Sequence, residues 1–462
     1  MLTIGDWTRR GRRDFLKVGS LALGGLALDQ LLGLRAGAAE GGRVASDKSV
    51  VFLFMHGGPS QTETFDPKMT APAGVHSATG ELATTMPGVT FGGTFPRLAA
   101  LAHKLIAVRS FVTGDGNHDI KPVVGRDTFG ANLGSIYSRV VGMNHAQTGI
   151  PTNVVLFPRS VDPSTQPGTA SFGKFGSSGS LGAAFAPFDP SAGGDLQEDL
   201  KLSLSMDRLD DRRNLLARLD GMKRSLDAGL VDGMDRMREQ AFNTILGGVA
   251  DAFDLAKEHR LTAARYDTAP LVRPENIDRK WNNYNNYVDN AKSLGKLLLL
   301  ARRLCERGCG FVTVTTNFVW DMHADVNNAG VEEGMRYMGT PLDHAVSAFI
   351  EDVEARGLSD KILLVCCGEM GRTPRINKNG GRDHWGSLAP LLLFGGGLRG
   401  GQIIGQSTRD AGEALSQPVS IKNLLATIMH VLFDVGELRV VRDVPRDIAQ
   451  TMTEWTPIPG VI

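Results

Sequence analysis

The residues of this chain most suited to chemistry include a carboxylate and an imidazole two positions apart. In an extended segment, residues at this spacing point to the same side, so Asp321 and His323 can bind one ion together. Oxygen and nitrogen ligands suit zinc, manganese or a similar divalent metal. The alternative is a hydrogen bond between the two side chains without a metal.

Three more candidate metal ligands come later in the chain. Glu369 stands at the end of a strongly apolar run, and a carboxylate in this position indicates a functional role such as metal binding. Asp383 and His384 are adjacent, so their side chains would diverge on a strand. Both can bind only from a turn, which the glycines around them permit. Otherwise one of them binds and the other supports it, or the segment is an ordinary surface loop.

The candidates for catalysis are Arg372, His118 and Ser60. The planar guanidinium of Arg372 could clamp an anionic substrate, and an ordinary surface arginine is the alternative. The nucleophile could be Ser60, Thr113 or the turn at residues 117–118. It could equally be water, because a divalent ion can lower the pKa of water from about 16 to about 7.

The elements that must position these side chains are short apolar runs rich in β-branched residues. They predict strands at residues 49–55, 104–109, 153–157, 310–316, 361–367 and 389–394. Helical patterns at residues 291–307 and 342–356 each end at a glycine and are each followed by a strand. This alternation predicts an α/β fold with a doubly wound, mainly parallel sheet flanked by helices. Ligands bind at the carboxyl ends of the strands in such sheets, so the candidate residues would meet at one edge.

The first residues of the chain have the pattern of an export signal. The pair Arg12-Arg13 precedes an apolar stretch at residues 18–34, and a small-residue cleavage site follows at 36–38. We therefore expect residues 1–38 to be a signal peptide recognised by the twin-arginine translocase, and the mature protein to be periplasmic or cell-surface. The alternative is an uncleaved membrane anchor.

The composition limits the class of protein. Lysine plus arginine equal aspartate plus glutamate, 50 against 50, so no basic field attracts nucleic acid. The 462 residues suffice for one large domain, and we expect a single α/β domain over residues 39–462. A charged, helix-favouring segment at about residues 195–265 predicts a helical insertion beside the sheet.

Five ordered motifs of the chain resemble those of the exported bacterial proteins grouped as domain of unknown function family 1501. The motifs lie at residues 56–68, 117–119, 299–323, 368–374 and 381–385, so the resemblance covers nearly the whole mature chain. The family looks like a branch of the alkaline phosphatase and sulfatase superfamily, which implies a metal-supported phospho- or sulfohydrolase fold. Two positions depart from the pattern: the family usually has His and then Asp where this chain has Gln61 and Glu63.

The leading hypothesis is an exported metal-dependent hydrolase of phosphate or sulfate esters, acting on a small anionic ester or a sulfated or phosphorylated glycan. One or two divalent ions, zinc or manganese, would be bound by five side chains: Asp321, His323, Glu369, Asp383 and His384. One alternative is a non-catalytic exported protein that binds a glycan or another exported partner. The other is an α/β serine hydrolase with Ser60 as its nucleophile.

Overall fold

We describe the protein from a computed structural model over residues 44–192, 249–438 and 446–462. The signal peptide predicted at residues 1–38 and most of the insertion predicted at about 195–265 lie outside these ranges. The last part of the insertion is described and contains two short helices, α8 (Ala250–Phe253) and α9 (Arg260–Arg265). In the described ranges, no helix combines the length and the apolar character that a membrane span requires.

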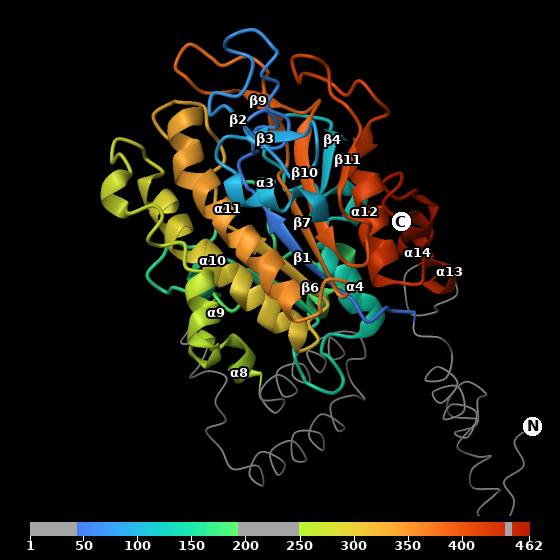
Figure 1. Ribbon diagram of the computed structural model, residues 1–462. Coiled ribbons are helices and arrows are strands. Elements are labelled where there is room, and N and C mark those ends of the chain that lie inside the picture. The colour runs from blue at the N-terminus through green and yellow to red at the C-terminus, as the bar shows by residue number, and fades with distance from the viewer. Residues whose placement is uncertain (1–43, 193–248, 439–445) are drawn as a thin grey trace, which may run out of the picture.

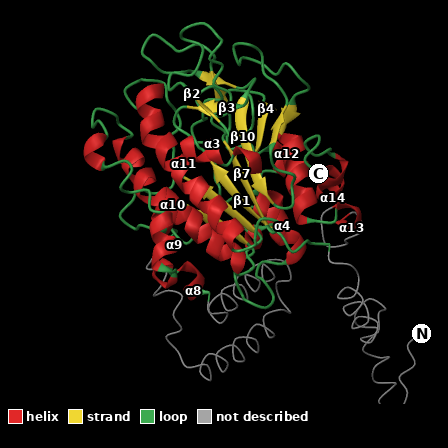
Figure 2. Cartoon of the chain, viewed as in Figure 1, coloured by secondary structure: helices red, strands yellow, loops and turns green. Residues whose placement is uncertain are grey.

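One mixed, mainly parallel sheet of eight strands forms the centre of the molecule (Figure 2). Its strands along the main path, in spatial order, are β11 (Gln402–Ile404), β4 (Ile106–Val112), β10 (Ala389–Gly395), β7 (Ile362–Cys367), β1 (Ser49–Phe54), β6 (Phe311–Thr315) and β5 (Asn153–Leu156). The eighth strand, β12 (Val419–Ser420), pairs with β4. β10 runs antiparallel to both of its neighbours, and every other pair in this sheet is parallel.

Two small antiparallel pairs lie outside the main sheet. The first pairs β2 (Glu81–Ala83) with β3 (Thr90–Gly92), and the second pairs β8 (Gly371–Arg372) with β9 (His384–Trp385). The second pair contains two of the residues that the sequence singled out, and it lies in the upper part of the molecule in Figure 1.

Helices cover both faces of the sheet, which confirms the doubly wound arrangement (Figure 1). The helices α3 (Pro96–Ala100), α10 (Tyr284–Glu306) and α11 (Val331–Ala355) pack in one apolar core, with Val51 and Leu53 of β1. The helices α4 (Leu133–Val141), α12 (Ile421–Leu432), α13 (Val435–Leu438) and α14 (Arg446–Glu454) contribute to a second core, with Val50 and Phe52. Alternate residues of one strand thus enter opposite cores, and the strand is apolar from Val50 to Phe54 because both of its faces are buried there.

All six predicted strands are present, and the largest difference is at β4, which was predicted at residues 104–109 and spans Ile106–Val112. The two predicted helices are also present, but both begin earlier than predicted. α11 runs through Pro341, which lies inside the helix, so the start predicted at residue 342 was wrong. α10 begins at Tyr284, whereas its predicted start was residue 291.

Candidate functional site

The carboxyl ends of β1, β6 and β7 lie side by side and form the floor of the site. Phe54 of β1 is in register with Thr315 of β6 and with Cys367 of β7. The segments that carry Asp321 and Glu369 therefore leave the sheet at the same edge, on either side of the end of β1. This edge is where a doubly wound sheet places its ligands.

The segment that carries Asp383 and His384 reaches this edge from the opposite direction. Because β10 is antiparallel to β7, the amino end of β10 lies beside the carboxyl end of β7. The residues just before β10 form β9, in which His384 pairs with Arg372 of β8. The antiparallel strand thus brings His384 to the cluster.

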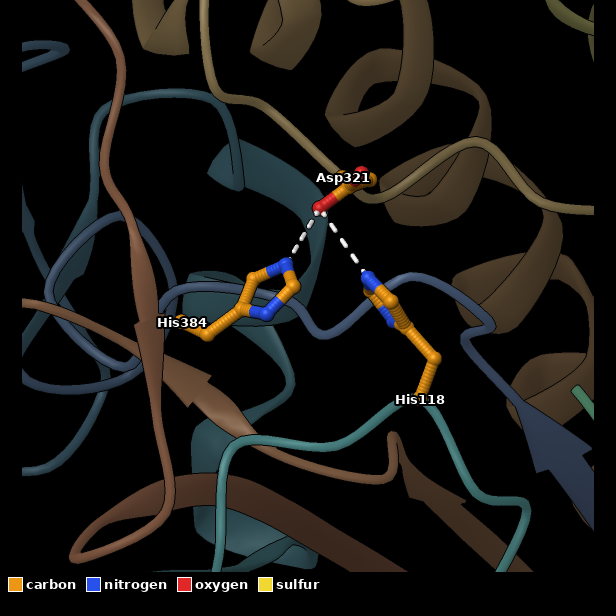
Figure 3. A group of neighbouring side chains, drawn as sticks. All are labelled: His118, Asp321 and His384. Atoms are coloured by element: carbon orange, nitrogen blue, oxygen red, sulfur yellow. Dashed lines mark hydrogen bonds and ion pairs between the residues drawn. The ribbon is translucent and has the colours of Figure 1, made fainter.

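The Oδ1 atom of Asp321 is the centre of the cluster (Figure 3). The Nε2 atoms of His323, His384 and His118 lie 2.9, 3.3 and 3.6 Å from this oxygen. The ligand atoms of His118, Asp321 and His384 all lie within 4.8 Å of one another. Three imidazoles from separate segments therefore face one carboxylate oxygen, a donor set typical of zinc sites.

Two further carboxylates contact the outer ring nitrogens of these histidines. Glu369 Oε1 lies 2.9 Å from Nδ1 of His118, and Asp383 Oδ1 lies 3.2 Å from Nδ1 of His323. Carboxylates in this position fix the orientation of a metal-binding histidine, so that its other nitrogen points inward. We predicted Glu369 and Asp383 as direct ligands, whereas the structure places them behind the histidines.

Glu369 is held in place by the end of β1. The backbone N–H of Gly57 donates to Glu369 Oε1 at 2.9 Å. Gly57 has φ +114°, and a Cβ there would lie 2.6 Å from the backbone nitrogen of Asp321. Only glycine therefore allows this close approach of the strand end to the segment that carries Asp321.

The environment sets the charges of the cluster. Burial alone would raise the pKa of Asp321, but hydrogen bonds from His323 and His384 outweigh burial and hold this pKa well below its usual range. Burial lowers the pKa of His118 to about 3, and the charge of His384 acts in the same direction. At neutral pH, Asp321 is a carboxylate and His118 a neutral imidazole, which are the forms that bind metals.

The arrangement fits a divalent cation. The Nε2 atoms of His323 and His384 are only 2.8 Å apart, so two nitrogen lone pairs converge there unless a proton or a cation lies between them. Glu369 is fully buried, and its Oε2 atom has no hydrogen-bond partner in the described ranges. A buried carboxylate oxygen without a partner is rare in proteins, and a nearby positive charge would compensate it.

Arg372 is bonded to the protein on all sides. Its Nη2 donates to Asp321 Oδ1 at 2.5 Å, and its Nε donates to the backbone oxygen of Gly58 at 2.7 Å. Its Nη1 donates to the backbone oxygen of Arg382 at 3.2 Å, and only 1% of the side chain is exposed. The guanidinium thus compensates Asp321 in this structure, and its action as a clamp for an anionic substrate stays a prediction.

Gln61 and Glu63, the two departures from the family pattern, hold the arginine segments. Gln61 Nε2 donates to the backbone oxygen of Arg372 at 2.8 Å, and its Oε1 accepts from the backbone N–H of the same residue at 3.0 Å. Glu63 Oε1 lies 2.9 Å from Arg382 Nη2, and both of these side chains are fully buried. Arg382 directly precedes residues 383–384, so this ion pair anchors the segment that carries them.

Ser60, the predicted nucleophile of a serine hydrolase, does not join the cluster. Its hydroxyl shares a hydrogen bond of 2.9 Å with Thr62 Oγ1 and is buried in its own turn. The other hydroxyl candidate, Thr113, is also buried, and its Oγ1 has no partner within the described part of the chain. The structure therefore brings together all the predicted site residues except Ser60, and their catalytic and ligand roles stay predictions.

Two asparagines outside the predicted set of site residues position Asp321. Asn328 Nδ2 donates to Asp321 Oδ2 at 3.2 Å, and Asn328 Oδ1 accepts from Asn283 Nδ2 at 2.7 Å. The second bond orients the amide of Asn328 so that its NH₂ faces the carboxylate. The sequence signal for this contact was the asparagine-rich run at residues 282–286, which is remote from Asp321 along the chain.

We expect Asn328→Ala to weaken the binding of zinc by about 10- to 100-fold, the usual effect of removing a group that orients a ligand. The loss leaves Asp321 Oδ2 without its amide donor. Isothermal titration with zinc measures the change. Asn285→Ala, which removes an exposed amide from the same asparagine-rich run, is the matched control and should bind as the wild type does. Equal affinity of the Asn328 variant and the control would contradict the role of Asn328.

The model of a family described as "Protein of unknown function (DUF1501)" matches residues 47–438. A search of curated proteins gives no match.

Among solved structures, the PsFucS1 sulfatase from Pseudoalteromonas sp. is 10% identical, with a TM-score of 0.37, over 87% of this chain and 70% of the sulfatase. The phosphonate monoester hydrolase SpPMH from Silicibacter pomeroyi is 10% identical, with a TM-score of 0.29, over 83% of this chain and 73% of the hydrolase.

Proposed function

The chain belongs to the DUF1501 family of proteins of unknown function, and from its own site we propose that it is an exported metal-dependent hydrolase of phosphate or sulfate esters. One observation carries the proposal. The Nε2 atoms of three histidines lie within 3.6 Å of a single buried oxygen, Asp321 Oδ1. Hydrolases use such sets of histidine nitrogens beside a carboxylate oxygen to bind a divalent ion.

Four residues would hold the ion: His118, Asp321, His323 and His384. Three nitrogens and one oxygen favour zinc, and manganese is the other candidate. A divalent ion at such a site polarises an ester oxygen and lowers the pKa of water to about 7. The carboxylates of Glu369 and Asp383 hold two of the histidine rings in place through their Nδ1 atoms.

A bound divalent ion would give the site its affinity for an anionic substrate. Asp321 carries one negative charge, and Arg372, whose Nη2 lies 2.5 Å away, compensates it. His118 is neutral because burial lowers its pKa to about 3. The carboxylates of Glu369 and Asp383 lie behind the histidine rings, so the oxygens of a phosphate or sulfate ester would be attracted by the ion itself. Small anionic esters and sulfated or phosphorylated glycans are the proposed substrates.

Export is part of the proposal and rests on the sequence. The pair Arg12-Arg13, the apolar stretch and the small-residue site occur in the order of a twin-arginine signal. A chain exported by this route folds in the cytoplasm first, so it can take up its metal ion before it leaves. The mature protein is accordingly proposed to act in the periplasm or at the cell surface.

The direct test is ester hydrolysis by the zinc- or manganese-loaded protein. We expect release of phosphate or sulfate from aryl and sugar esters, and a loss of at least about 100-fold in rate after chelation or in the His384→Ala variant. Metal added back should restore the chelated wild type. His259→Ala, which removes an exposed histidine beside α9, is the control and should keep full activity.

Two other outcomes would contradict the proposal. Hydrolysis that survives complete removal of metal would show that the cluster does not supply the chemistry. A protein that binds neither metal nor esters but binds glycans would support the non-catalytic alternative.

A further inference from the structure

Two phenylalanine rings border the cluster beside His118. The rings of Phe172 and Phe318 stack, with centroids 4.6 Å apart and planes 30° from parallel. The His118 ring lies 4.6 Å from Phe318 and 4.9 Å from Phe172. One wall of a site made of charged and polar groups is therefore aromatic.

Phe172 presents part of its ring to solvent. It is 36% exposed, and it is the one aromatic residue among the large hydrophobic side chains that are exposed in the described ranges. The ring of Phe318 is also partly exposed. Exposed apolar rings beside polar groups are a usual feature of binding sites, because a ligand can cover them.

The loop that carries Phe172 is fixed against the body of the protein. Gly173 has φ +146°, and a Cβ there would lie 2.6 Å from the side chain of Ile120. Phe175 is buried and packs edge-on against Phe54 of β1, with centroids 5.4 Å apart. The position of Phe172 beside His118 is thus set by tight local packing.

The exposed rings and the open side of the cluster lie next to each other. The ring of His118, only 11% exposed, contacts both the His384 ring, with centroids 4.3 Å apart, and the Phe172 ring, with centroids 4.9 Å apart. His384 is 33% exposed, so the cluster is accessible from its side. The Phe172 ring therefore lies only one histidine ring away from the exposed His384.

We propose that Phe172 and Phe318 form a stacking subsite for esters whose alcohol part carries a flat ring face, aromatic or saturated. This inference rests on the proposed function and names its substrate class. The anion binds at the histidine cluster, and the ring of the alcohol part covers Phe172. An ester of a small alkyl alcohol makes only the contact between its anionic group and the histidine cluster.

The test uses phosphonates, in which the carbon–phosphorus bond resists hydrolysis, so that equilibrium binding is measured. The zinc-loaded protein is titrated with phenylphosphonate, cyclohexylphosphonate and methylphosphonate. We expect at least one ring compound to bind roughly 2- to 10-fold more tightly than methylphosphonate, the range that ring contacts usually give. If only phenylphosphonate binds more tightly, the alcohol part of the substrate carries an aryl group. If only cyclohexylphosphonate does, the alcohol part carries a saturated ring such as that of a sugar.

The variants separate stacking from general effects. Phe172→Ala should abolish the preference for the ring compounds while leaving the affinities for methylphosphonate and zinc unchanged. Phe172→Trp should retain the preference for the ring compounds. Leu261→Ala, at an exposed apolar position of α9, should behave as the wild type. If the protein binds zinc but shows no preference for the ring compounds, or binds zinc but no phosphonate, the stacking subsite alone is overturned. A protein that binds no zinc or other divalent ion would overturn the proposed function, and the subsite with it.

Discussion

Elemental analysis of the purified protein is expected to find about one equivalent of zinc or manganese, and Asp321→Asn is expected to weaken that binding by at least about 100-fold. The reason is the central place of Asp321 Oδ1, which faces three imidazole nitrogens. Asparagine keeps the shape of the side chain and removes its negative charge. A loss of 100-fold corresponds to about 3 kcal/mol of binding free energy.

The Asp321→Asn variant also changes the stability of the fold, so a second variant is needed. Asparagine leaves the buried guanidinium of Arg372 without its counter-charge, which costs stability. His384→Ala removes a side chain that is 33% exposed and is expected to weaken metal binding with little effect on unfolding. Zinc titration and thermal unfolding of both variants separate the two effects. Wild-type metal affinity in both variants would show that the cluster binds no ion.

The second large effect is expected from Glu63, whose loss should destabilise the protein by roughly 3–5 kcal/mol. Glu63 and Arg382 form a fully buried ion pair, and Glu63 Oε2 also accepts a hydrogen bond of 2.9 Å from Ser77 Oγ. Glu63→Ala would leave the guanidinium of Arg382 buried without a counter-charge. Denaturant unfolding measures the difference in free energy.

The control for this experiment is an exposed ion pair. Asp47 and Lys361 lie 2.8 Å apart at the surface, so Asp47→Ala should change the stability by less than about 1 kcal/mol. Because Arg382 precedes Asp383 and His384, the Glu63 variant is also expected to bind zinc more weakly. Unchanged stability of Glu63→Ala would show that the pair does not anchor this segment.

The sequence predicted the sheet well because the relevant information is local. A run such as residues 50–55 is apolar at every position, and such a run forms a strand buried on both faces. The helix starts were less accurate: α11 continues through Pro341, where contacts from the rest of the molecule override the local preference. Helix starts depend on packing as well as on the residues at the boundary.

The sequence by itself determined which residue types stand at the strand ends, and so the general chemistry of the site. Only the tertiary structure decided which atoms of those residues face one another. Glu369 lies behind His118 because Gly57 and the end of β1 hold it there. The pair Glu63–Arg382 spans 319 residues of the chain, and the antiparallel direction of β10 brings His384 to the cluster. Contacts between such distant segments depend on the packing of the whole sheet, which no local pattern encodes.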